Sequence, residues 1–101
     1  PVPDRAPARS AWHLYPIRLR RGFSKNRRAI FAALRKAGIG VQTHYIPVYR
    51  HPYYQKLGYK KGLCPKAEEF YESEISLPLF PTLAARDQEY IVRQIRALIR
   101  A

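Results

Sequence analysis

The chain has 101 residues, of which 47% are hydrophobic, and its 19 Lys and Arg against 7 Asp and Glu give a formal net charge of +12. This length has room for one hydrophobic core, and the apolar content argues against intrinsic disorder. No apolar run approaches the ~18 residues of a membrane span, so we expect a soluble protein with no membrane partner. Cys64 is the single cysteine, which excludes an internal disulfide and a Cys-pair zinc site and fits a reducing, cytoplasmic setting.

The strong positive charge has two explanations. A basic surface of this strength binds the phosphates of nucleic acid, whereas a chain that is part of something larger has its charge balanced elsewhere. No RNA-recognition aromatic motif or helix-turn-helix spacing accompanies the basic cluster, and a solvated charged face is the commoner reason for such a run. The cluster comprises Arg18, Arg20, Arg21, Lys25, Arg27 and Arg28.

The first third of the chain predicts a linker, a strand and a helix. Residues 1–10 contain three prolines and few residues that could be buried in a core, so we expect them to be a linker from a missing upstream domain. Residues 12–19 alternate as in a strand, and Pro16 favours a sheet edge because it lacks a backbone donor. A helix is expected from a cap at Ser24 or Asn26 to about residue 37, closed by Gly38.

The remaining residues predict two more strands and three more helices. Residues 39–48 alternate as in a strand, and residues 74–79 do so again. Short helices are expected to begin at Pro52 and Pro65, because proline is favoured at the first position of a helix. The second of these is expected to turn Ala67, Phe70 and Tyr71 inward, and a last helix is expected from Thr82.

This order of elements predicts an α+β two-layer sandwich, with a three-stranded, mostly antiparallel sheet and helices on one face. The other face of the sheet would be left partly bare. Such a face is a liability in an isolated domain and an interface in a larger protein.

The residues supply no complete catalytic set. His13, His44 and His51 are the three histidines, and a zinc site built from them without a cysteine ligand is not expected. Cys64 is expected to be a buried thiol without a chemical role, rather than a nucleophile. We therefore assign no catalytic, cofactor-binding or metal-binding residue to the chain.

Three segments carry a family resemblance. Residues 38–48, GIGVQTHYIPV, are followed by His51-Pro52 and Tyr59, and this string resembles the C-terminal domain of the DegT/DnrJ family of nucleotide-sugar aminotransferases. Residues 64–95 and residues 12–18, WHLYPIR, are similar to the same family in the same order. The resemblance covers nearly the whole chain, and within the family it is strongest to the transaminases of pseudaminic acid biosynthesis.

The resemblance implies a fold-type I enzyme that depends on pyridoxal phosphate (PLP). In that family a large domain holds the cofactor, the small domain, here residues 11–101, closes over the substrate, and a homodimer forms active sites at the subunit interface. Glutamate is the implied amino donor and a 4-keto nucleotide sugar the acceptor. The PLP lysine, the carboxylate facing the pyridinium nitrogen and the stacked aromatic ring all lie in the large domain, so we expect the isolated fragment to hold no cofactor and to be inactive.

His44 and Tyr45 are the residues that we expect to bind substrate, because an imidazole and a phenol at a strand end can hydrogen-bond sugar hydroxyls or phosphate oxygens. The alternative for Tyr45 is a place in the core. His13 and Tyr15 are expected to pack on their strand, and His51 to cap a helix. From the residues alone, a free-standing basic nucleic-acid-binding module and a stand-alone structural or interaction protein stay open as other functions.

Overall fold

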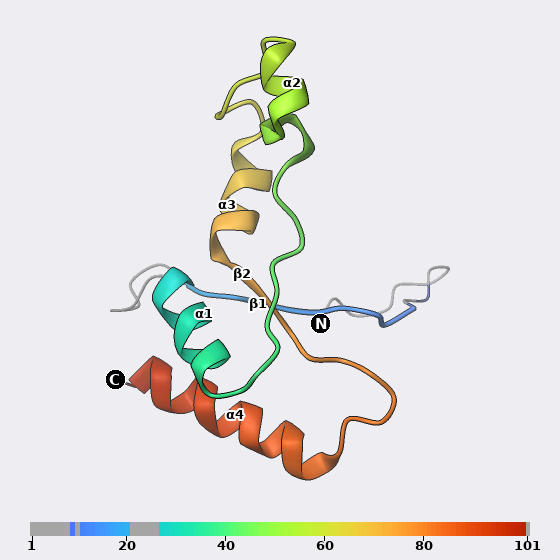
Figure 1. Ribbon diagram of the computed structural model, residues 1–101, viewed down its shortest axis with the longest axis vertical. Helices are drawn as coiled ribbons and strands as arrows, with labels where there is room; N and C mark the ends of the chain where they lie inside the picture. Colours follow the sequence, from blue (N-terminus) through green and yellow to red (C-terminus); the bar gives the residue numbers. More distant parts are fainter. Residues whose placement is uncertain (1–8, 10, 21–26, 101) are drawn as a thin grey trace.

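The computed structural model describes residue 9, residues 11–20 and residues 27–100 (Figure 1). Its elements, in chain order, are β1 (Tyr15–Arg18), α1 (Arg27–Lys36), the 3-10 turn η1 (Val48–Arg50), α2 (Pro52–Lys56), α3 (Pro65–Ser73), β2 (Glu74–Leu77) and α4 (Ala85–Arg100). The predicted linker lies outside the described residues except for Arg9, and so do the predicted caps Ser24 and Asn26. No helix in the described part of the chain is long and apolar enough to cross a membrane.

In the described part of the chain the sheet has two strands, so the prediction of three was wrong. β1 pairs antiparallel with β2, with Tyr15 opposite Leu77. The segment expected to form a further strand makes a single bridge, in which Gln42 and Ser76 exchange backbone hydrogen bonds of 3.1 and 2.8 Å. Two residues later the His44 N–H donates to a side chain at 3.0 Å, so the donor that could extend the ladder is already used.

Pro16 lies where its missing N–H costs no hydrogen bond. It is opposite Ser76, whose backbone N–H and C=O both face Gln42 on the other side of β2. Antiparallel ladders alternate hydrogen-bonded and non-hydrogen-bonded pairs, and Pro16 occupies one of the latter. The structure thus agrees with the prediction that this strand lies at a sheet edge.

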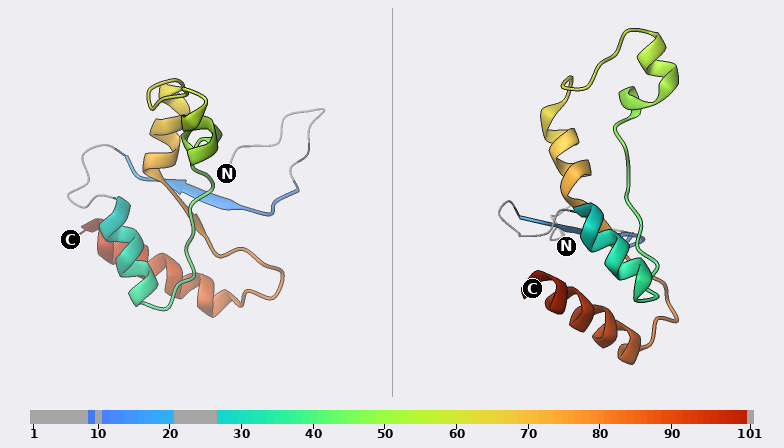
Figure 2. Two further views of the ribbon diagram at one scale, coloured as in Figure 1. Left: turned by 45° about the horizontal axis from the view of Figure 1, so that its top comes forward. Right: turned by 60° about the vertical axis from the view of Figure 1, so that its left-hand side comes forward.

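The core lies between the sheet and two helices. Ile75 and Leu77 alternate with Glu74 and Ser76 along β2, so one face of the strand is apolar and the other polar. Helices α1 and α4 pack together on the apolar face, as the prediction of helices on one face requires (Figure 2). The buried hydrophobic side chains are Ile30, Leu34, Ile39, Val41, Ile75 and Ile91.

Gly38 ends α1 as predicted. Its φ of 78° lies in the left-handed region, which a glycine adopts without a Cβ clash. The Ile39 N–H donates to the Leu34 carbonyl at 3.0 Å, which completes the glycine-based helix end. The Tyr90 hydroxyl of α4 donates to the Ala37 carbonyl at 2.9 Å and so ties the two core helices together.

Helix α4 begins later than predicted. It starts at Ala85 rather than near Thr82, because the Ala84 carbonyl accepts the first helical hydrogen bonds, from the N–H groups of Asp87 and Gln88. The Gln88 side chain also donates to the Leu83 carbonyl at 3.1 Å, which holds the turn before the helix.

Residues 47–73 form an arm that projects away from the sheet and the core helices (Figure 1). Its helices α2 and α3 begin at Pro52 and Pro65, as predicted. The predicted inward face of α3 was wrong for Ala67 and Phe70, which are exposed, whereas Tyr71 is half-buried and Glu68 is the fully buried residue. Hydrogen bonding rather than apolar burial therefore sets the rotation of α3.

Glu68 joins three parts of the arm. Its Oε1 accepts hydrogen bonds from the Tyr49 hydroxyl at 2.5 Å and from the Gly62 N–H at 2.6 Å. These two donors lower the pKa of the Glu68 carboxyl, the Tyr49 bond having the larger effect. The pKa of Tyr49 is raised, first by burial and then by its bond to Glu68.

Cys64, whose N–H contacts the Tyr49 oxygen at 3.2 Å, is exposed, so the prediction of a buried thiol was wrong.

Candidate substrate-binding site on the polar face of the sheet

His44 lies against the polar face of β2. Its Nδ1 is 2.8 Å from the Ser76 hydroxyl oxygen, and its backbone N–H donates to Glu74 Oε2 at 3.0 Å. The Ser76 hydroxyl in turn donates to Glu74 Oε1. Glu74 is completely buried and Ser76 is 3% exposed, so the sheet holds His44 through two groups shielded from water.

Tyr45 extends from the same segment into solvent. Its side chain is 71% exposed, so the alternative that placed Tyr45 in the core was wrong. The ring meets the His44 imidazole edge to face, with 4.6 Å between centroids. The two residues predicted to bind substrate are therefore neighbours, one anchored on the sheet and the other free to contact a ligand.

Glu74 and Ser76 were not among the predicted site residues. The alternation of residues 74–77 places both on the face opposite the core, where side chains are ordinarily solvated. The sequence showed only a carboxylate and a hydroxyl two residues apart on the strand face that the predicted helices do not cover. This face becomes a candidate site because residues 42–44 pack against β2, and sequence patterning does not reveal such a long-range contact.

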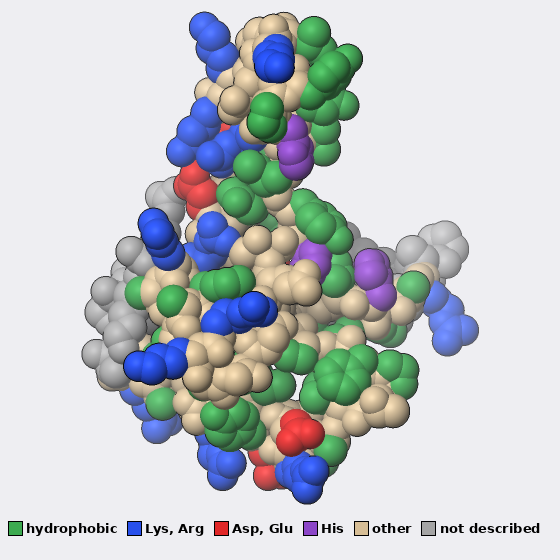
Figure 3. Space-filling model, viewed as in Figure 1, with side chains coloured by type: hydrophobic (Ala, Val, Ile, Leu, Met, Phe, Trp, Pro, Cys, Tyr) green, Lys and Arg blue, Asp and Glu red, His purple; other side chains and the backbone are tan. Residues whose placement is uncertain are grey.

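The other singled-out aromatic and histidine residues play smaller parts. His13 is exposed and precedes β1, so the prediction that it packs on the strand was wrong; Tyr15 lies in β1 but is also exposed, at 40%. His51 precedes α2, and its carbonyl, not its ring, accepts from the Gln55 N–H at 3.1 Å. Histidine side chains show on the face drawn in Figure 3.

Tyr15 also borders an apolar groove of about 260 Å³ between the sheet and the start of α4. Phe80, which is 50% exposed, and Val92, which is 44% exposed, belong to the same groove. Its other lining residues are Leu77, Pro78, Leu79, Leu83, Gln88 and Ile91.

The described part of the basic cluster is partly neutralised within the chain. The Arg18 guanidinium lies 3.5 Å from Glu69 and donates to the Ser73 hydroxyl at 3.2 Å. Arg27 stacks on the Tyr71 ring at 5.0 Å. Arg21 and Lys25 lie outside the described residues.

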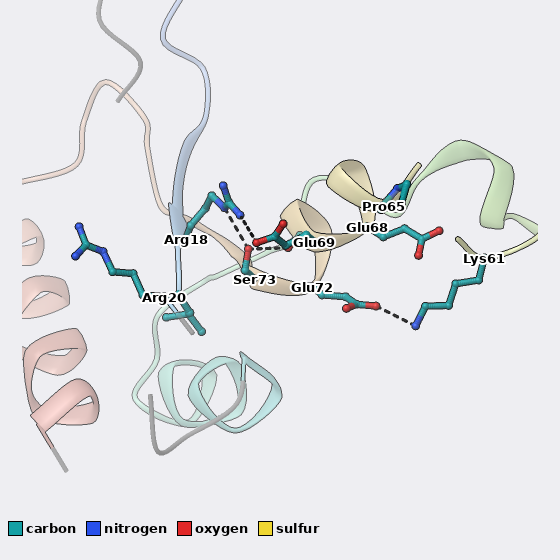
Figure 4. Close-up of a pocket in the computed structure, with 9 residues that line it drawn as sticks. Arg18, Arg20, Lys61, Pro65, Glu68, Glu69, Glu72 and Ser73 are labelled. Atoms are coloured by element: carbon teal, nitrogen blue, oxygen red, sulfur yellow. Dashed lines mark hydrogen bonds and ion pairs between the residues drawn. The ribbon is translucent and has the colours of Figure 1, made fainter. Parts of the chain in front are cut away.

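Arg18 belongs to an open groove of about 710 Å³ between β1 and α3, which both basic and acidic side chains line (Figure 4). Lys61 pairs with Glu72 there at 3.1 Å. Mixed charge of this kind is not the uniformly positive surface that phosphate backbones select. Among the described residues, no group of three or more His, Cys, Asp or Glu side chains is arranged to hold a metal ion.

The chain belongs to the DegT/DnrJ/EryC1/StrS aminotransferase family, whose model matches residues 1–96. An uncharacterized protein of Methanocaldococcus jannaschii is 42% identical over 91 residues, covering 88% of this chain and 24% of its own length. The UDP-4-amino-4,6-dideoxy-N-acetyl-beta-L-altrosamine transaminase of Helicobacter pylori is 36% identical over 87 residues, covering 86% of this chain and 23% of its own.

Solved structures agree with this assignment. Helicobacter pylori PseC, an aminotransferase involved in the biosynthesis of pseudoaminic acid, superposes with a TM-score of 0.79 at 34% identity, over 87% of this chain and 24% of its own. The PLP form of the putative sugar aminotransferase Spr1654 of Streptococcus pneumoniae superposes with a TM-score of 0.80, also at 34% identity, over 87% of this chain and 22% of its own. The chain thus spans about a quarter of the length of the relatives that it matches.

The described lysines do not fit a PLP site. A lysine that forms the covalent link to PLP is held in a desolvated pocket among groups that tune its reactivity. All five described lysines are exposed, and Lys61 is paired with Glu72. No step of PLP chemistry is therefore assigned to these residues.

Proposed function

We propose that residues 11–101 are the small C-terminal domain of a PLP-dependent aminotransferase that acts on a 4-keto nucleotide sugar with glutamate as amino donor. Residues 1–10 would link this domain to a large domain that holds the cofactor. The observation that carries the proposal is the family match over residues 1–96, in a chain that spans about a quarter of the aminotransferases it resembles. A free-standing domain with its own catalytic residues would not depend on the other three quarters of those aminotransferases.

The contribution of this chain would be to bind and orient the sugar. The exposed Tyr45 phenol and the imidazole of His44 offer hydrogen bonds to sugar hydroxyls or phosphate oxygens. His44 is held on β2 through its backbone N–H and its Nδ1, which favours a fixed geometry for the imidazole. PLP supplies the electron sink of the reaction when it is bound, and the proposal places it in the large domain.

The proposed partners follow from the same assignment. They are the large PLP domain, a second subunit in a homodimer and the nucleotide sugar, in the cytoplasm. The name of one relative, the spore coat polysaccharide biosynthesis protein SpsC of Bacillus subtilis, supports a place in cell-surface polysaccharide biosynthesis. The name of PseC supports the formation of pseudaminic acid. The apolar groove between β2 and α4 supports burial against another domain, since isolated proteins rarely leave such surface open.

The test compares the isolated chain with the whole gene product. We expect the 101-residue chain to show no PLP absorbance and no transamination. We expect the whole product to aminate a 4-keto nucleotide sugar with glutamate and to contain a PLP lysine upstream. Turnover by the isolated chain, or a gene without a PLP domain, would contradict the proposal.

A basic nucleic-acid-binding module is the second candidate, and the net charge of +12 is the observation that favours it. Its signature is affinity for random DNA that falls with salt yet persists near physiological ionic strength. Binding that disappears at about 0.15 M salt would remove the nucleic-acid-binding candidate.

A further inference from the structure

The hydrogen bonds between His44, Ser76 and Glu74 have a definite direction. A serine hydroxyl has one proton, and Ser76 donates it to the buried Glu74 carboxylate. The Ser76 oxygen must then accept at its 2.8 Å contact with His44 Nδ1. The neutral imidazole therefore carries its proton on Nδ1, and Nε2 keeps a lone pair.

That lone pair is available for a ligand. No residue in the described part of the chain hydrogen-bonds Nε2, whereas the sheet holds both the backbone N–H and Nδ1 of His44. Glu74 sets the direction of both contacts, because one oxygen accepts from the His44 main chain and the other from Ser76. In the Ser-His-Asp triad a carboxylate fixes the histidine tautomer by accepting directly from Nδ1–H, whereas here the Ser76 hydroxyl lies between the Glu74 carboxylate and the imidazole.

We propose that Glu74 and Ser76 are positioning residues that present His44 Nε2 to the nucleotide sugar as a hydrogen-bond acceptor, so that His44 accepts a sugar hydroxyl proton rather than donating its own. This inference rests on the proposed function for its ligand and on the hydrogen bonds of this chain for its geometry. Complete burial of Glu74 is unusual for a carboxylate and is consistent with a purpose beyond solubility.

The first experiment reads the tautomer directly. The full 101-residue chain, labelled with ¹⁵N-histidine, is measured by long-range ¹H–¹⁵N correlation at pH ~8.5, where an ordinary imidazole is neutral. We expect His44 to show the Nδ1–H form, with the exposed His13 and His51 as internal references. An Nε2–H form of His44 would overturn the proposal.

Glu74→Gln is the sharpest variant, because it changes hydrogen-bond direction with little change in shape. The amide oxygen can accept the His44 N–H while its NH₂ donates to Ser76, which then turns its own proton to Nδ1. We therefore expect the variant to move His44 to the Nε2–H form. A purely structural role would leave the tautomer in place, so an unchanged tautomer in folded protein would contradict the proposal.

Ser76 variants decide the matter if Glu74→Gln does not fold. Ser76→Ala should abolish the preference for Nδ1–H, and Ser76→Thr, which keeps the hydroxyl, should retain it. Ser73→Ala is the matched control, since Ser73 bonds Arg18 and does not contact His44. Equal tautomer ratios in the Ala and Thr variants at residue 76 would overturn the proposal.

The whole enzyme then separates this inference from the proposed function. Ser76→Ala should raise the KM for the nucleotide sugar about tenfold, the loss of about one oriented hydrogen bond, and leave the KM for glutamate unchanged. Ser76→Thr should restore it. An unchanged sugar KM overturns the positioning role, whereas a whole enzyme that aminates no nucleotide sugar overturns the proposed function and leaves the tautomer result standing.

Discussion

Glu68 and Tyr49 are joined by a hydrogen bond of 2.5 Å that spans 19 residues of sequence and closes the arm on itself. The same carboxylate oxygen holds the Gly62 N–H, so one ionised side chain fixes η1, the loop after α2 and α3 relative to one another. The order of the arm therefore depends on the charge of Glu68.

Acid should loosen the arm before it unfolds the core. Because the pKa of Glu68 is lowered in the folded chain, its stabilisation is present above the ordinary glutamate pKa of about 4.3 and is lost as the pH falls through the lower folded value. The Gly62 amide resonance, followed by NMR from pH 6 to pH 2, should report this transition. Tyr49→Phe removes the larger cause of the shift, so its midpoint should move to higher pH. Identical midpoints in the two proteins would refute this.

Gly38→Ala should destabilise the chain by about 1–2 kcal/mol, the cost of the left-handed conformation for a residue with a Cβ. The added methyl would meet no atom within 4 Å at this position, so the cost is in the backbone alone. Gly40→Ala is the matched control, because its site is equally open and its φ is not positive. Urea unfolding of both variants measures the difference, and equal midpoints would rule out the backbone explanation.

Loss of the site side chains should affect the sugar and not the amino donor. In the whole enzyme we expect His44→Ala and Tyr45→Ala each to raise the KM for the nucleotide sugar by about tenfold, while the KM for glutamate stays the same. Tyr53→Ala serves as the control, since Tyr53 is 67% exposed and lies on the arm. Steady-state kinetics with both substrates would show a parallel change in the two KM values if His44 and Tyr45 were only structural.

The isolated chain should self-associate through the apolar groove between β2 and α4. Phe80→Ser removes an exposed ring from this groove and should shift the protein toward monomer. Leu63→Ser is the control, because Leu63 is 56% exposed but lies outside the groove. Sedimentation velocity at increasing concentration distinguishes the two variants, and a strictly monomeric parent chain would contradict the prediction.

Local signals predicted the end of α1 and the starts of α2 and α3, but not the start of α4. Gly38 closes α1, and Pro52 and Pro65 open α2 and α3, because the conformational limits of glycine and proline act within one turn. The absence of the predicted third strand could not be foreseen in the same way. The hydrogen bonding of residues 39–48 with β2 stops at His44, because its N–H donates to the side chain of Glu74, 30 residues away.

The candidate site could be approached from the sequence only in part. The chemistry of an imidazole and a phenol at a strand end suggested His44 and Tyr45, whose rings meet edge to face in the structure, and their role in binding substrate stays a prediction. The supports Glu74 and Ser76 escaped prediction, because an alternating strand does not reveal what crosses its polar face. Glu68 escaped similarly: its partner Tyr49 is far along the chain, and apolar patterning gave α3 the wrong inward face.

The two ends of the arm have a mechanical consequence. The outgoing end leaves the sheet through His44 and Tyr45, and the returning end, Ser73, runs directly into Glu74. The two ends of the arm are therefore joined by the hydrogen bonds of His44 with Glu74 and Ser76. A displacement of the arm would change the orientation of the His44 imidazole.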